Sequence, residues 1–168
     1  MAREFVDGFV SHSHSWGRGE FTEPLVRFLY PDMRAYESWG NGEQPEREHV
    51  FNAVHGHRIY AHNWRVEQMA PLSLRTRRYY DAYPELSENP ISTLDAKCAG
   101  CLAELFEGRR MVVTAGNPTG LDVEVTLSIP AQGAMLFDRV DGLRLPLDRG
   151  TAKLKLRPWD FRCFELRP

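Results

Sequence analysis

The chain has 168 residues, of which 42% are hydrophobic and 26% are charged, a composition typical of an ordered globular protein. Its formal net charge of -2 gives no electrostatic reason to bind nucleic acid or an anionic membrane. No apolar stretch approaches the roughly 18 residues that span a bilayer, and the charged opening MAREFVDGFV lacks the apolar core of a secretion signal.

The first predicted elements are a strand and a helix separated by a long loop. Residues 25–30 (LVRFLY) predict a buried strand, and the polar residues 31–44 predict the loop. Pro45 is well placed to open the helix, because the first helical position needs no backbone N–H. The apolar stripe of that helix is expected to comprise Val50, Phe51 and Val54.

The next predicted elements repeat this order. Gly56 suits the end of the first helix, residues 57–62 (HRIYAH) predict a strand, and a second helix is expected from near Pro71. One face of the second helix is expected to carry Leu72, Thr76, Tyr79, Tyr80 and Tyr83. Strands that alternate with helices predict a parallel sheet whose crossovers cover it.

The two kinds of connection differ in length. The predicted connections after the strands, 31–44 and 62–70, are long and rich in polar and aromatic residues, whereas the turn at Gly56 is minimal. In barrels and open α/β sheets, ligands bind on the side where strands lead into helices. We therefore expect a ligand to meet the two long connections.

The hydrophobic pattern changes near residues 84–95 (PELSENPISTLD), which predict a linker. Beyond it, apolar and polar residues alternate over 122–129 and 153–157, the period of strands with one buried face. Turn residues recur between these segments. Six or seven short strands in this half predict a small antiparallel β-sandwich.

Short phrases of the sequence resemble a known arrangement. VRFLYPD, FNAVHGHRIY and RRYYDAYPEL look like the closing units of glycosidase-type (β/α)8 barrels, closest to the broad α-galactosidase-like group and to uncharacterised glycoside-hydrolase-like bacterial proteins. ELFEGRRMVVTAGNPTGLDVEVTLSIP, closed by LKLRPWDFRCFEL, is similar to the β-sandwich domains that follow such barrels. The resemblance implies an α/β plus all-β fold, with terminal βα units of an incomplete barrel at 1–90 and a sandwich at 91–168.

The resemblance implies a carboxy-terminal fragment or subunit of a carbohydrate-active, glycoside-hydrolase-like protein that is not catalytically complete alone. A complete barrel needs about 250 residues, so a missing amino-terminal barrel portion or a homo-oligomer is an expected partner besides carbohydrate. The alternative is a noncatalytic carbohydrate-binding or assembly module. An upstream reading frame encoding the earlier βα units would favour the enzyme.

Glycoside hydrolysis usually needs two carboxyl groups, about 5 to 5.5 Å apart for retention or 6.5 to 9.5 Å for inversion. Asp32 and Glu37 are the best candidates on the expected ligand side, although the sequence contains no diagnostic catalytic signature. The alternative is that both are solvated loop acids or partners of Arg27 and Arg34.

Aromatic rings stack on sugar faces, and polar neighbours bind hydroxyl groups. We therefore predict that a set of residues in and around the long connections faces a sugar. The alternative is that Trp39 and Trp64 are packing anchors of these loops. The predicted set is Trp16, Tyr30, Trp39, His62, Asn63 and Trp64.

The histidines and cysteines predict neither a metal site nor another cofactor. His55 and His57 stand in no compact metal motif, and we interpret them as ordinary polar residues at strand ends. Cys98 and Cys101 form a single CxxC without the further ligands that zinc requires, and Cys163 is expected in the core. Three cysteines form no disulfide framework, which predicts a cytoplasmic protein.

Overall fold

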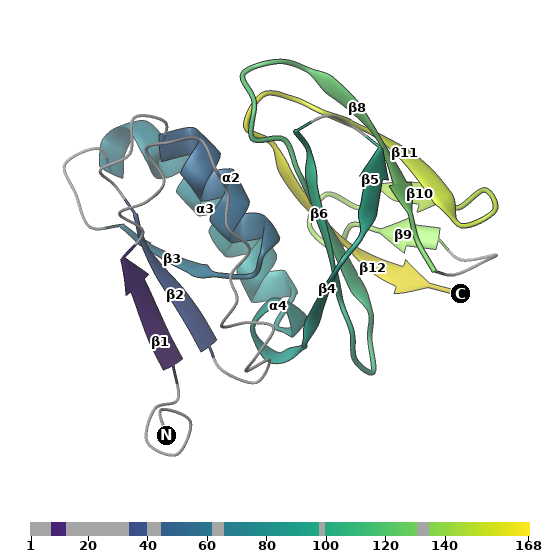
Figure 1. The fold of residues 1–168 in the computed structure, drawn as a ribbon, viewed down its shortest axis with the longest axis horizontal. Helices are drawn as coiled ribbons and strands as arrows, with labels where there is room; N and C mark the ends of the chain where they lie inside the picture. Colours follow the sequence, from purple (N-terminus) through teal and green to yellow (C-terminus); the bar gives the residue numbers. More distant parts are fainter. Residues whose placement is uncertain (1–7, 13–33, 40–44, 62–65, 98–99, 131–134) are drawn as a thin grey trace.

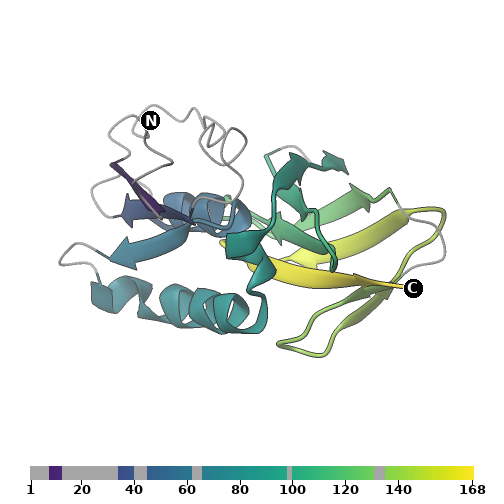
Figure 2. The same ribbon diagram turned by 90° about the horizontal axis from the view of Figure 1, so that it is seen from below.

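The computed structural model of the chain describes residues 8–12, 34–39, 45–61, 66–97, 100–130 and 135–168. The elements lie in layers: a parallel sheet, a pair of helices, and two antiparallel sheets (Figure 1). Figure 2 shows from a second direction that helix α2 separates the parallel sheet from the antiparallel sheets. No helix within the described ranges is long and apolar enough to cross a membrane.

The parallel sheet has three strands in the order β1-β2-β3. They are β1 (Gly8–His12), β2 (Arg34–Trp39) and β3 (Arg58–Ala61). The parallel pairing and the strand at 58–61 confirm the prediction, and the strand expected at 25–30 lies outside the described residues. The prediction of a loop over 31–44 is wrong, because these residues contain β2, the central strand. Its sequence, RAYESW, is too polar for a hydrophobic pattern to indicate a strand.

Helix α2 lies between the parallel sheet and the antiparallel sheets, and helix α3 packs beside it (Figure 2). Helix α2 (Pro45–Val54) begins at the predicted proline and buries the predicted stripe. Helix α3 (Val66–Ala82) begins earlier than Pro71, which lies inside it. In the second turn of a helix a proline removes one backbone hydrogen bond and crowds the carbonyl group four residues before it, yet α3 continues through Pro71. Thr76, Tyr79 and Tyr83 are buried, as the predicted face requires.

The segment predicted as a linker is ordered structure. Helix α4 (Glu85–Glu88) is followed by strands β4 (Ile91–Thr93) and β5 (Asp95–Lys97), which pair with strands of different sheets. Leu86 and Ile91 are buried, and these apolar anchors hold the segment in place. The division of the chain into units 1–90 and 91–168 stays a prediction.

Within the described residues, nine strands form two antiparallel sheets, more than the six or seven expected. The reason is that three-residue strands such as β4 carry no periodic signal. The larger sheet has the order β10-β9-β12-β7-β6-β4, and the smaller sheet has the order β11-β8-β5. The remaining strands are β6 (Leu102–Phe106), β7 (Val112–Gly116), β8 (Val123–Ser128), β9 (Met135–Phe137), β10 (Arg144–Pro146), β11 (Thr151–Leu156) and β12 (Phe161–Arg167).

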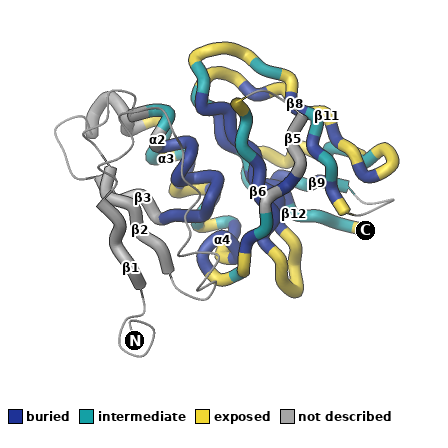
Figure 3. Tube along the Cα trace, in the orientation of Figure 1, coloured by how far each residue is buried: buried dark blue, intermediate teal, exposed yellow. Residues whose placement is uncertain are grey.

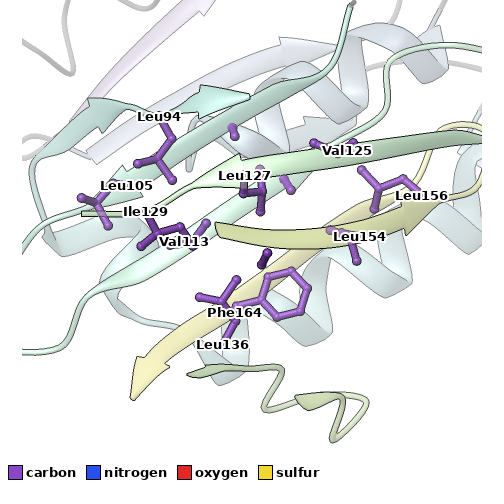
Figure 4. Packing of buried hydrophobic residues seen from close by; sticks show 13 residues of the cluster. Leu94, Leu105, Val113, Val125, Leu127, Ile129, Leu136, Leu154, Leu156 and Phe164 are labelled. Atoms are coloured by element: carbon purple, nitrogen blue, oxygen red, sulfur yellow. The ribbon is translucent and has the colours of Figure 1, made fainter. Parts of the chain in front are cut away.

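One apolar cluster joins the two antiparallel sheets, which together we call the sandwich. Figure 4 shows residues of both sheets meeting in it, among them Leu127 and Leu154 from the smaller sheet and Val113 and Phe164 from the larger. The predicted alternation is confirmed, because Leu154 and Leu156 are buried whereas Lys153 and Lys155 are exposed.

A second apolar cluster joins the larger sheet to the helices, and we call it the helix–sheet interface. It comprises Val50, Ala53, Val54, Tyr79, Tyr83, Leu86, Ile91, Phe106, Val112, Phe161 and Cys163. The larger sheet is therefore covered on both faces, which explains why every residue of β7 is buried (Figure 3). The predicted core position of Cys163 is confirmed.

The turn between α2 and β3 depends on Gly56, whose φ of 70° favours glycine. A Cβ atom there would lie 2.3 Å from the carbonyl oxygen of Leu86 and 2.8 Å from Cε1 of Phe106. At Gly142 φ is 71°, but a Cβ atom would meet nothing within 4 Å. The two glycines therefore separate the cost of the backbone conformation from the cost of the steric clash.

We expect Gly142→Ala to lower the free energy of unfolding by about 1 kcal/mol and Gly56→Ala by about 2–4 kcal/mol, because only the second substitution adds overpacking to the left-handed backbone. Urea unfolding of both variants followed by circular dichroism measures the difference. An equal loss of unfolding free energy in the two variants would contradict the close contact between the Gly56 turn and α4.

Candidate functional site

The three parallel strands end at one edge of their sheet, which we call the carboxyl edge and define by His12, Trp39 and Ala61. In the strand register His12 lies opposite Ser38, and Trp39 lies opposite Ala61. The strands run in one direction, so the segments that follow them start from this edge (Figure 1). It is the edge at which ligands bind in α/β sheets.

Two predicted site residues lie on the central strand β2. Glu37 lies opposite Ser11 of β1 and Ile59 of β3, and Trp39 is the last residue of the strand. The position of Trp39 at the carboxyl edge agrees with the expected ligand side. The other predicted residues, Trp16, Tyr30, Asp32, His62, Asn63 and Trp64, lie outside the described residues, so a pairing of Asp32 with Glu37 stays a prediction.

The charged residues with perturbed pKa values gather instead at the rim of the helix–sheet interface. Arg139 donates to Glu85 at 3.0 and 2.9 Å and to Glu165 at 3.3 Å, and its guanidinium lies 4.5 Å from the ring centre of Tyr83. Burial alone would lower the pKa of Arg139, but the two carboxylates outweigh burial and raise it. Arg139 therefore stays charged and links α4 to β12.

Glu165 is the reciprocal half of this contact. Burial alone would raise the pKa of Glu165, but hydrogen bonds from Arg139 and Arg167 outweigh burial and lower it. Arg167 donates from Nε to Glu165 at 2.8 Å. The carboxylate is thus held ionised between two guanidinium groups and has no proton to offer a substrate near neutral pH.

A second group of charges surrounds Asp138, which is fully buried. The Tyr79 hydroxyl donates to Asp138 at 2.8 Å, and Arg162 lies 3.4 Å from the same carboxylate oxygen. Arg162 also contacts Asp141 and Asp160. Burial, assisted by Asp138, raises the pKa of Tyr79, so this hydroxyl stays protonated.

Perturbed pKa values often mark active sites, but ion-pair networks perturb them as well. Here the charged groups pair with protein groups of opposite sign. Pairs that cross the helix–sheet interface join Arg75 of α3 to Asp160 at 2.7 Å and Glu85 of α4 to Arg139 at 2.9 Å, and they fix the two helices on the larger sheet. The sequence pattern found the helical stripe of Tyr79 and Tyr83 but not their acidic and basic partners. Those partners come from segments more than 50 residues away, such as Asp138.

His55 contacts protein groups through both of its ring nitrogens. Nδ1 of His55 lies 2.8 Å from the carbonyl oxygen of Phe51, and Nε2 of His55 lies 3.2 Å from Glu104 Oε1. This pair sits where α2 leads into β3, at the end of the sheet opposite the carboxyl edge. Within the described part of the chain, no group of three or more His, Cys, Asp or Glu residues could hold a metal ion.

The cysteines of the CxxC are only partly described. Cys101 is half-buried, and Cys98 lies outside the described residues. Cys163 is a free and buried thiol, and burial raises its pKa well above the usual value. The thiolate form of Cys163 is therefore disfavoured, as expected for a core residue.

No protein-family model and no curated protein sequence matches the chain. Among solved structures, an α-amylase from Anoxybacillus is similar to 76% of this chain, with a TM-score of 0.56 and 15% identity. The α-amylase of Geobacillus thermoleovorans complexed with acarbose is similar to 73% of it, with a TM-score of 0.53 and 15% identity. The maltogenic α-amylase AmyB of Thermotoga neapolitana is similar to 79% of it, with a TM-score of 0.55 and 11% identity.

This chain spans 33%, 33% and 42% of the length of those three structures. At such identities the similarity concerns the fold. The chain therefore shares a partial fold with glycoside hydrolase chains, whereas the narrower placement near α-galactosidases stays a prediction.

Buried His49 offers a test of how α2 packs on α3. Its Nε2 lies 2.7 Å from Thr76 Oγ1, and burial lowers its pKa from 6.5 to about 4. The unfolded chain takes up a proton at His49 as the pH falls through 6.5, whereas the folded chain does not until about pH 4. The folded state therefore loses stability across this window, by up to about 3 kcal/mol.

We expect His49→Gln, which can keep the hydrogen bond to Thr76, to show a smaller loss of unfolding free energy between pH 6.5 and 4 than the unchanged chain. Urea unfolding at half-unit pH steps measures the unfolding free energy of both proteins as a function of pH. At pH 7 the unfolding free energy of the variant and of the unchanged chain should depend on urea concentration with the same slope. Parallel curves across the acid window would rule out a neutral, buried His49.

Proposed function

We propose that this chain is the carboxy-terminal portion of a carbohydrate-active protein of the glycoside-hydrolase type. In this proposal residues 1–90 supply the closing βα units of a barrel and residues 91–168 supply the sandwich that follows it. The observation that best supports the proposal is the order of the layers, in which α2 packs between a parallel sheet and an antiparallel sandwich. The fold of this chain is similar to part of several α-amylases.

We further propose that the chain does not hydrolyse glycosides by itself. A (β/α)8 barrel closes with eight parallel strands, and the described residues contribute three. Catalytic residues of such barrels come from the ends of several strands, so three strands offer an incomplete set of positions. The remaining strands would come from further βα units in the same protein, from another chain, or from a second copy.

The proposed sugar-facing surface is the carboxyl edge. In this proposal Trp16, Tyr30, Trp39, His62, Asn63 and Trp64 contact carbohydrate, and Asp32 and Glu37 are the candidates for a carboxylate role. The register of β2 supports part of it, because Trp39 is the residue at which the central strand reaches this edge. The Geobacillus thermoleovorans α-amylase was solved with the sugar analogue acarbose, which makes acarbose a suitable probe.

A noncatalytic carbohydrate-binding or assembly module is the alternative. It shares the expectation that the chain alone does not hydrolyse sugars, and it differs in needing no other barrel strands. A reading frame that encodes the earlier βα units, and whose product restores hydrolysis when combined with this chain, would favour the enzyme portion.

The proposal predicts that the whole chain binds acarbose or maltotriose weakly and does not hydrolyse maltotriose. Trp39→Ala should weaken binding roughly five- to tenfold, because a sugar face loses its aromatic platform, whereas Trp39→Phe should restore much of it. Isothermal titration calorimetry measures the affinity, and release of glucose and maltose measures hydrolysis.

Phe137→Ala is the matched control, because it also removes a partly exposed aromatic ring, and Phe137 lies on β9 of the sandwich, outside both the carboxyl edge and its connections. It should leave the affinity unchanged. Hydrolysis by the chain alone would overturn the claim of incompleteness. Absence of binding to both probes, or equal loss of affinity in the Trp39→Ala and Phe137→Ala variants, would overturn the sugar-facing edge.

A further inference from the structure

The sandwich carries a groove of its own, away from the carboxyl edge. It has a volume of about 360 Å³ and is lined by the start of β8 and the end of β11, through residues Asp122, Val123, Glu124, Lys155, Leu156 and Arg157. This volume is near the lower end of the range of small-molecule sites, roughly 300–1,000 Å³. We call it the sandwich groove.

The groove is flanked by four exposed charged residues, two acids from one strand segment and two bases from the other. Glu124 lies opposite Lys155 in the antiparallel register, and such opposed charges usually pair across strands. Yet within the described residues Asp122, Glu124, Lys155 and Arg157 take part in no ion pair. Their charged ends are therefore available to a ligand.

The rim of the groove is fixed from behind by buried Asn117. Its Nδ2 donates to the carbonyl oxygen of Leu121 at 2.7 Å and to that of Arg157 at 2.8 Å. Its Oδ1 accepts from the backbone N–H of Thr119 at 3.0 Å and from the Thr119 hydroxyl at 2.7 Å. One side chain thus ties together the segments that flank the paired ends of β8 and β11, over which the groove lies. This reduces the ordering cost of binding.

The lining specifies the chemistry of a ligand. Carboxylates accept hydrogen bonds, and ammonium and guanidinium groups donate them, so a ligand must offer both hydrogen-bond donors and hydrogen-bond acceptors. The two negative and two positive charges cancel, so the groove does not select an ion of either sign. Half-buried Val123 and exposed Leu121 add apolar surface next to these groups.

We propose that the sandwich groove binds one or two sugar units of a neutral carbohydrate. A sugar is neutral, carries hydroxyl groups that both donate and accept, and has apolar C–H faces. The choice of carbohydrate rests on the proposed function, whereas the groove itself does not. The β7–β8 connection, which leads into the groove, lies at the end of the molecule toward which β1 points (Figure 1). A longer carbohydrate chain held here would extend toward the same end as the carboxyl edge.

Two-dimensional ¹H–¹⁵N NMR of the whole chain tests the inference. Maltotriose, cellobiose and melibiose serve as neutral probes, and glycine serves as a zwitterionic probe. At least one sugar should shift the amide signals of residues 121–124 and 155–157 in a saturable manner, and glycine should not. Lys155→Ala and Glu124→Ala should each weaken that binding about tenfold, because each removes a hydrogen bond made by a charged group.

Lys153→Ala is the matched control, because Lys153 is an exposed lysine of the same strand that does not line the groove. It should leave the affinity unchanged. If the sugars shift only signals of the parallel strands and their connections, the groove inference is overturned and the proposed function stands. If they shift only the groove signals, the inference stands and the carboxyl edge loses its support. Binding of glycine alone, or of none of the probes, overturns the inference.

Discussion

The contact of helix α2 with strand β7 is the constraint on which the rest of the structure depends. At Gly116 of β7, a Cβ atom would lie 2.4 Å from Cγ2 of Val54 and 2.7 Å from Cγ1 of Val50, so the helix approaches the strand as closely as a glycine allows. Thr114 of the same strand donates to the carbonyl oxygen of Val54 at 2.8 Å and thereby satisfies a free carbonyl at the helix end. Because β7 is central in the larger sheet, this contact fixes α2, and with it β2 and β3, relative to the sandwich.

The charged residues around the helix–sheet interface determine the orientation of the helices in this apolar contact. Burying Arg139, Glu85 and Asp138 costs desolvation energy, so their ion pairs are weak evidence for net stability. The pairs that cross the interface favour one orientation, because a shift of α3 would separate Arg75 from Asp160 and a shift of α4 would separate Glu85 from Arg139. The functional consequence is geometric. The contacts of α2 with the parallel sheet on one side and with β7 on the other connect the carboxyl edge to the sandwich.

Local chemistry in the sequence predicted much of this fold. Pro45 and Gly56 mark the ends of α2, and alternation around Leu127 and Leu154 predicts the strands of the sandwich. The misses have non-local causes. The polar strand β2 is central because it pairs with β1 and β3, and α4 with β4 is ordered through distant apolar partners. The sandwich groove could not be predicted from the sequence either, because it depends on the non-local strand pairing that places Glu124 opposite Lys155. Of the predicted site, only the strand positions of Glu37 and Trp39 are described, so its chemistry rests on the sequence and the resemblance.

The account makes the helices and the larger sheet one cooperative unit, and native-state hydrogen exchange measures this most directly. The amides of residues 50–54 in α2 and 112–116 in β7 lie in elements that share the apolar cluster of the helix–sheet interface. We predict that both groups exchange only through global unfolding and therefore with the same free energy and the same dependence on urea. Exchange of the α2 amides at a clearly lower free energy, while β7 stays protected, would contradict the account, because the helices would then open independently of the sandwich.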